Sequence, residues 1–161
     1  MPRAITRGIA LYRAFFAPVD HCIVAAITWE TSPGPVESLF SHAARVSLEG
    51  ELAREEQPID EERIKVLQWV TQHAGSFDYE RIIEVLAKAD FRAAFPAAFT
   101  AGDVHFIAPD KRALFHMHDD RGVDIAAVER ATLAPLYRRF NDWLLDHDRR
   151  RIDAVFAGID E

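Results

Sequence analysis

The sequence predicts a single α+β domain over residues 1–161, with an antiparallel sheet of four or five strands packed against helices. Three observations support this fold class. Apolar residues recur at helical spacing near both ends of the chain, strand-length runs lie between them, and two turn sequences join neighbouring strands of the last third. A chain of 161 residues, 49% of them hydrophobic, is long enough to bury one core.

The first predicted element is a helix over residues 3–17, which ends before Pro18. Its apolar stripe consists of Ile5, Ile9, Tyr12 and Phe16. A nearly unbroken apolar run over residues 22–29 predicts a strand that is covered on both faces. Two prolines and a glycine within residues 32–35 require a loop, because they cannot continue a strand ladder. The pattern over residues 36–46 is ambiguous and favours a short helix.

Residues 49–62 are predicted to form an exposed acidic connection. Apolar and polar positions alternate over residues 63–71, which favours a strand, although residues 61–73 also fit a helix. Asp78 is placed to cap a helix over residues 79–89. The inward-facing residues of that helix are Ile82, Ile83 and Leu86.

A hairpin is predicted in the last third of the chain. Its strands are residues 103–108 and 112–118, with residues 110–111 as the two turn residues. A second turn ends at Gly122, which is available for a positive φ, and leads to a short strand over residues 123–127.

The chain is predicted to end in two helices. The first has apolar residues at Leu133, Leu136, Tyr137, Phe140 and Leu144, with Pro135 tolerated in its first turn. Asp146 or Asp148 can cap the second helix. The buried stripe of the second helix is Ile152, Val155, Phe156 and Ile159.

Most of the net charge of −7 lies in one segment. The fourteen residues 49–62 contain seven acidic residues and one basic residue, Arg54, and so carry a net charge of −6. The seven are Glu49, Glu51, Glu55, Glu56, Asp60, Glu61 and Glu62. Such a surface repels nucleic acid and anionic lipid and attracts a basic protein. The alternative is a solvated acidic loop that has no partner.

Histidines and carboxylates gather on one face of the predicted hairpin. The group is His105, His116, His118, Asp103, Asp120 and Asp124. Alternation along the strand places His116, His118 and Asp120 together, and the register adds His105 beside His116 and Asp103 beside His118. Imidazoles with carboxylates can hold zinc or another divalent ion. However, the spacing matches no established metal motif, and an exposed sheet face often carries such residues for solubility alone, so we expect no metal and no cofactor.

Two further constellations have simpler structural interpretations. The residues Asp119, Asp120, Arg121 and Asp124 can bind magnesium or act as general acid and base, but a tight turn also requires such residues. The carboxylates of residues 141–149, around Trp143, are expected to cap two successive helices. The basic run over residues 149–151 is expected to be a solvated helix face.

The motifs of several enzyme classes are missing from the sequence. It has no glycine-rich phosphate loop, no nucleophile elbow around a serine and no HExxH helix. Cys22 is the single cysteine, which excludes an intramolecular disulfide, and its apolar surroundings favour an inert thiol. We therefore expect a protein that is not an enzyme.

Residues 114–156 carry the motifs DDRGVDI and LAPLYRRFNDWLLDHDRRRIDAVF. This part of the chain resembles the C-terminal half of a bacterial family known as a domain of unknown function, in which an aromatic residue followed by DDRGxD precedes NDWxLDxDR. His118 stands where that family usually has tyrosine. Small acidic proteins of this kind are also similar to the immunity proteins of bacterial toxin systems, including contact-dependent growth inhibition.

The expected function is therefore that of a cytoplasmic immunity protein, which would dock the acidic segment onto a basic toxin domain, such as a nuclease, and cover its active site. No membrane partner is expected, because no apolar run approaches the roughly 20 residues that cross a bilayer. The rival hypothesis is a metal-dependent hydrolase or nucleotide-processing enzyme that uses His116, His118, Asp120 and Asp124.

Overall fold

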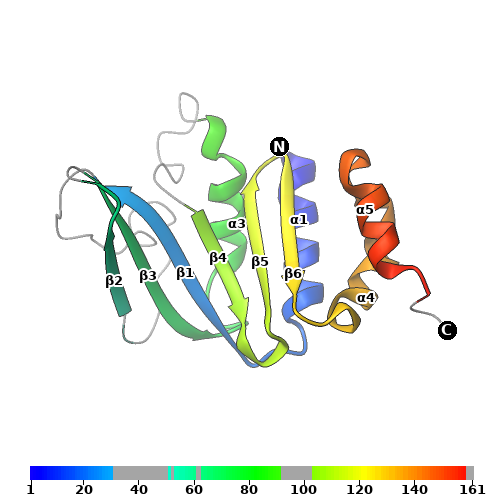
Figure 1. The fold of residues 1–161 in the computed structure, drawn as a ribbon, viewed down its shortest axis with the longest axis horizontal. Coiled ribbons are helices and arrows are strands. Elements are labelled where there is room, and N and C mark those ends of the chain that lie inside the picture. Colours follow the sequence, from blue (N-terminus) through cyan, green and yellow to red (C-terminus); the bar gives the residue numbers. More distant parts are fainter. Residues whose placement is uncertain (31–50, 52, 61–62, 92–102, 159–161) are drawn as a thin grey trace.

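A computed structural model of the protein describes residues 1–30, 51, 53–60, 63–91 and 103–158. In these residues one antiparallel sheet has six strands in the order β2-β3-β1-β4-β5-β6, with helices beside it (Figure 1). The α+β class is thus confirmed, whereas the predicted number of four or five strands is wrong. The predictions for residues 32–35 and 36–46 lie outside the described residues.

The strands are β1 (His21–Glu30), β2 (Ala53–Pro58), β3 (Ile64–His73), β4 (Asp103–Ala108), β5 (Ala113–Asp119) and β6 (Gly122–Ala127). The helices are α1 (Pro2–Phe16), α3 (Tyr79–Ala87), α4 (Arg130–Phe140) and α5 (Asp146–Phe156). No helix in the described part of the chain is both long and apolar enough to span a membrane.

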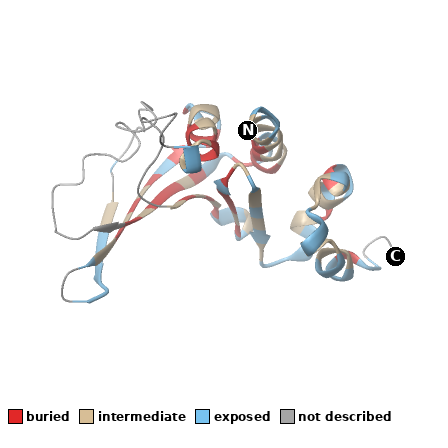
Figure 2. Ribbon diagram, turned by 90° about the horizontal axis from the view of Figure 1, so that it is seen from above, coloured by how far each residue is buried: buried red, intermediate tan, exposed pale blue. Residues whose placement is uncertain are grey.

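Helices α1 and α3 pack on one face of the sheet and enclose the core (Figure 2). Tyr12 lies at its centre, with its ring stacked on Tyr79 at 4.2 Å between centroids and edge-on to Phe106 at 5.1 Å. Its hydroxyl donates to the carbonyl of Ala74 at 3.2 Å. The predicted stripe of the first helix therefore does face the core, as its 3.6-residue period requires.

A glycine in α1 permits close packing of the helix layer. A Cβ atom at Gly8 would lie 3.1 Å from Ile83 of α3 and 3.2 Å from Met117 of β5. Both neighbours are fully buried, so the missing side chain lets the two helices and the sheet approach closely.

The acidic segment contains strand β2, so its prediction as a mere connection is wrong. Ala53 pairs with Trp69 and Pro58 with Ile64, which makes β2 the terminal strand beside β3. The prediction missed this strand because its sequence has no apolar alternation. An edge strand instead forms through the backbone groups that its neighbour offers.

Strand β3 excludes the helical alternative for residues 61–73. Val66, Gln68, Val70 and Gln72 are buried in strict alternation, as one inward-facing side of a strand requires. In β1 the prediction of cover on both faces is only half correct, because Ile23 and Ile27 on the face away from α1 and α3 are partly exposed.

The predicted hairpin register is confirmed by β4 and β5, in which Phe106 pairs with Phe115. The connection is longer than the predicted two residues: it has a 3-10 turn, Pro109–Lys111, and then Arg112 in the left-handed region with φ 48°. At the second turn the expected positive φ of Gly122 is not found.

Helices α4 and α5 lie beyond β6, at the edge of the sheet opposite β2 (Figure 1). Tyr137 of α4 stacks on Phe156 of α5 at 4.3 Å between ring centroids. Pro135 is the sixth residue of α4, not part of its first turn.

Helix caps were predicted with mixed success. The prediction for α3 is confirmed, because the Asp78 side chain accepts a hydrogen bond from the backbone N–H of Arg81 at 3.0 Å. At α5 neither Asp146 nor Asp148 is the cap. The cap position is Leu145, and the two aspartates lie in the first turn, where negative charge is favourable next to the helix dipole.

Candidate functional site: a histidine cluster on the open face

The face of the sheet opposite α1 and α3, here called the open face, presents one row of side chains across all six strands. Direct cross-strand pairing aligns the row Ala53, Trp69, Ala25, His105, His116 and Asp124. The half on β2, β3 and β1 is largely apolar, and the half on β4, β5 and β6 is polar. The open face therefore changes character at the step from β1 to β4.

The polar half contains the histidine cluster, which we define as Asp103, His105, His116, His118 and Asp124. The ring of His116 lies between those of His105 and His118, at centroid distances of 4.2 and 4.1 Å. This arrangement follows from the sequence: His116 is directly opposite His105 across the β4–β5 pair, and His118 is the next residue on the same face of β5.

The two carboxylates of the cluster contact different histidines. Asp124 Oδ2 lies 2.8 Å from His118 Nε2, within hydrogen-bonding distance. Asp103 Oδ1 lies 3.7 Å from His116 Nε2, which is too long for a hydrogen bond. Asp103, His105 and His116 each offer one ligand atom, and all three atoms lie within 4.8 Å of one another.

Burial and mutual proximity keep the central histidine neutral at pH 7. Burial, together with the neighbouring His105 and His118, lowers the pKa of His116 to about 4, against the smaller opposing effect of the carboxylates. Burial also lowers the pKa of His105. Burial therefore favours the neutral form of both His105 and His116.

Asp120 does not join the cluster, contrary to the prediction. Its carboxylate lies 3.5 Å from the amino group of Met1, at the start of α1. The strand pairing of β5 with β6 is irregular between Met117 and Asp119, and this interrupts the alternation on which the prediction depended. The residues proposed for the hydrolase hypothesis are thus only partly brought together.

The DDRG motif forms a structural clamp. Asp119 is buried, and its Oδ1 accepts from the backbone N–H of Arg121 at 2.7 Å while both oxygens accept from the Arg121 side chain. These hydrogen bonds lower the pKa of Asp119. Arg121 also reaches Asp90 at 3.1 Å. Each carboxylate of the motif thus has its own cationic partner, Arg121 for Asp119 and the amino group of Met1 for Asp120.

The NDW motif lies at a junction between helices that Arg149 holds together. Arg149 donates to Asn141 Oδ1 and to the Asn141 carbonyl, both at 3.0 Å, and so ties α5 to the 3-10 turn that follows α4. The guanidinium of Arg7 lies over the ring of Trp143 at 4.8 Å and connects this junction to α1. The prediction of a solvated basic face is therefore wrong for Arg149, although Arg150 and Arg151 are exposed.

The acidic segment lies far from the histidine cluster, at the other edge of the sheet. Among its predicted binding residues, Glu51, Glu55, Glu56 and Asp60 are exposed, and Glu49, Glu61 and Glu62 lie outside the described residues. Two of the four exposed acids already have basic neighbours. Glu56 contacts Arg54 at 2.6 Å and Asp60 contacts Arg63 at 2.6 Å.

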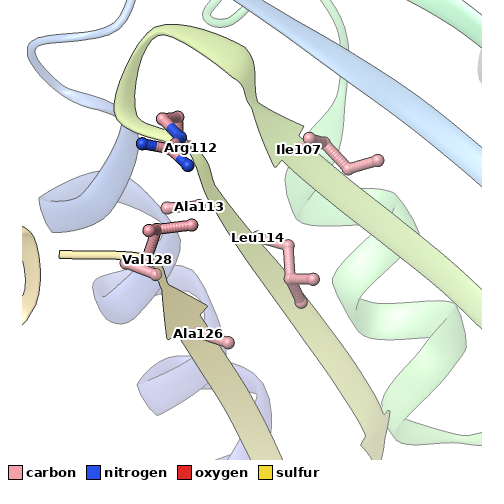
Figure 3. A pocket seen from close by; sticks show the side chains of 7 residues that line it. Ile107, Arg112, Ala113, Leu114, Ala126 and Val128 are labelled. Carbon is pink, nitrogen blue, oxygen red and sulfur yellow. The ribbon is translucent and has the colours of Figure 1, made fainter.

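A shallow apolar hollow of about 390 Å³ lies on the open face next to the histidine cluster (Figure 3). Ile107, Leu114 and Ala126 point into it from three neighbouring strands, with α1 and α3 behind the sheet. Its lining is mostly apolar and also includes Arg112, and the hollow opens broadly to solvent.

Comparison with known proteins places the chain in a family. No curated protein and no solved structure matches it significantly. A family model described as a domain of unknown function (DUF3885) matches residues 1–148, which include the sheet, the DDRG motif and the NDW motif. The chain therefore belongs to the DUF3885 family.

Proposed function

We propose that the chain is an immunity protein, which binds a basic toxin domain through its acidic segment and covers the active site of that toxin. A nuclease of a contact-dependent growth inhibition system fits this chemistry, because a nuclease surface carries positive charge for its substrate. The observation that carries the proposal is the position of the described acidic residues: Glu55 and Glu56 lie on β2, the terminal strand of the sheet, and Glu51 and Asp60 lie just outside its two ends.

A terminal strand offers two means of binding a protein. Among the strands that the structure describes, β2 pairs only with β3, so the backbone groups on its other edge can pair with an extended segment of a partner. Glu55 and Glu56 are both exposed and, as successive strand residues, point to opposite faces of the sheet. Negative charge thus surrounds the edge and attracts a basic partner from either side.

Charged edge strands also have a simpler purpose, since they prevent sheets from pairing edge to edge and aggregating. The two interpretations differ in what neutralisation does. If the acids only protect the edge, their removal promotes self-association. If they bind a toxin, their removal slows association with that partner.

The first experiment is co-expression of the untagged chain with the product of the coding sequence immediately upstream in its own genome. Gel filtration and mass spectrometry then test for a stoichiometric complex. The proposal expects a tight one-to-one complex with a protein that is toxic when expressed alone. A chain that elutes alone, with a harmless neighbour, would remove the main support for the immunity function.

The second experiment tests the surface with charge-matched variants. The triple variant Glu51→Gln, Glu55→Gln, Glu56→Gln removes three exposed acids at the β2 edge. Its control removes three exposed acids elsewhere, at Asp110, Glu129 and Asp142. Because both variants have the same net charge, only local steering separates them.

At low ionic strength the first variant is expected to associate about tenfold more slowly than wild type, with a weaker salt dependence, and the control much less so. Stopped-flow mixing measures both rates. Equal rates in the two variants would show that β2 is not part of the interface.

A further inference from the structure

We propose that Asp103, His105 and His116 form a binding site for one divalent transition-metal ion, of which zinc is the best match. The site is independent of the proposed immunity function, because it lies on β4 and β5 and not at the β2 edge. It also differs from the set considered in the hydrolase hypothesis: the two share only His116, and Asp103 and His105 stand in place of His118, Asp120 and Asp124.

The spacing of the three side chains is close to that of a coordination shell. Zinc binds imidazole nitrogen and carboxylate oxygen at about 2.0 to 2.2 Å, so two ligand atoms of a tetrahedral site lie about 3.4 Å apart. His116 Nε2 and Asp103 Oδ1 are 3.7 Å apart, and no pair among the three ligand atoms exceeds 4.8 Å. Small rotations of the partly exposed Asp103 and His105 side chains toward the buried His116 would close the shell.

The central ligand is a polar atom without a partner. His116 is 9% exposed, and its Nε2 has no hydrogen bond among the residues that the structure describes. Leaving such an atom buried and unpaired is unfavourable, whereas a metal bond would satisfy it. This orphan nitrogen is the atom that lies 3.7 Å from Asp103.

The donor set favours a transition metal over magnesium or calcium. Two imidazole nitrogens and one carboxylate suit zinc and its neighbours, whereas magnesium and calcium prefer oxygen ligands throughout. The Asp103 side chain is 46% exposed, so the site opens to solvent on that side. Three protein ligands with one position open to solvent is the arrangement of zinc sites that bind water or a further ligand.

His118 is expected to stay outside the shell. Its Nε2 is already 2.8 Å from Asp124 Oδ2, and the pair lies next to His116 without contributing to the convergent group. Substitution of His118 therefore serves as a control for substitution of the proposed ligands His105 and His116.

The test uses the untagged full-length chain, stripped with a chelator and titrated with zinc by calorimetry. Wild type is expected to bind one zinc ion per chain, and its thermal midpoint to rise when zinc is added. Magnesium is expected to produce neither effect. In wild-type protein labelled with ¹⁵N, the ring nitrogens of His105 and His116 are expected to shift most on zinc binding.

Variants then locate the ion. His105→Gln, His116→Gln and Asp103→Asn are each expected to weaken zinc binding at least tenfold. His118→Gln, and the double variant His21→Gln, His73→Gln, are expected to retain wild-type affinity. The double variant removes another cross-strand histidine pair, with ring centroids 5.7 Å apart, and so controls for adventitious binding by paired histidines.

Three results would overturn the proposal: absence of stoichiometric zinc binding in wild type, retention of binding after loss of His105 or Asp103, or equal loss in the His21 and His73 control. The ¹⁵N shifts of the wild type decide the matter if a variant at the buried His116 fails to fold.

Discussion

Replacing Asp119 with asparagine removes the negative charge of the DDRG clamp while preserving the shape of the side chain. The asparagine oxygen can still accept from the backbone N–H of Arg121, which is 2.7 Å from Oδ1 in the wild type. What disappears is the charge that faces the Arg121 Nε, at 2.9 and 3.0 Å from the two oxygens. Asparagine also places an amide N–H donor where Oδ2 accepts from Arg121, so the variant removes both the charge and one hydrogen-bond acceptor.

The expected cost lies between two limits. Hydrogen bonds to charged groups contribute roughly 1.5–3 kcal/mol, and exposed ion pairs about 0–1 kcal/mol. Asp119 is buried, with its side chain 5% exposed, but the Arg121 side chain is 76% exposed, so solvent screens one half of the pair. We expect a loss of about 1.5 kcal/mol in the free energy of unfolding, or about 3 to 6 °C in Tm for a chain of this size.

Urea unfolding at pH 7, with the m-value held common, measures this difference. Asp119→Ala is expected to lose more, because it also removes the acceptor for the backbone N–H. The matched control is Asp120→Asn, which alters the next carboxylate of the same motif and is expected to stay within about 0.5 kcal/mol of wild type.

The stability that the ionised Asp119 contributes should depend on pH in one direction. The folded pKa of Asp119 lies below its ordinary value of 3.8, so the stabilisation is complete above 3.8 and is lost as the pH falls through the folded pKa. The gap between wild type and Asp119→Asn should therefore be constant near neutrality and close in strong acid. A variant as stable as wild type at pH 7, or a gap that persists after acidification, would refute this explanation of the motif.

Two further predictions concern the core. Tyr12→Phe keeps the stacked ring but removes the hydroxyl that donates to the Ala74 carbonyl, and should cost about 1 kcal/mol in urea unfolding; a neutral result would mean that this hydrogen bond contributes nothing to stability. Cys22 is fully buried and burial raises its pKa to about 11, so a thiol reagent should label it only after the protein is unfolded in guanidinium; rapid labelling of the native protein would contradict its burial.

The sequence was sufficient to predict those elements whose residue pattern is strong over a short stretch of chain. Three features depend only on residues that are close together in the sequence, so the residue pattern predicts them directly. They are the apolar stripe of α1, the Asp78 cap of α3 and the register of β4 with β5. The same local reasoning placed His105 beside His116. It failed at the caps of α5 and at Gly122, where several short conformations fit the same residues.

Features that depend on contacts between residues far apart in the sequence could be seen only in the tertiary structure. Strand β2 has almost no apolar residues, and it exists because β3 presents free backbone groups to it. Asp120 turns to the amino group of Met1, far away in sequence, instead of joining the histidines.

The sequence by itself therefore determined the α+β class, the main helices and the histidine-bearing hairpin, because helical and strand periods are local properties of side-chain spacing. Only the tertiary structure decided that β2, within the acidic segment, forms the edge of the sheet and that Asp103 approaches the buried His116, whose Nε2 has no hydrogen bond among the described residues. Both features depend on strand pairing and twist across the whole sheet.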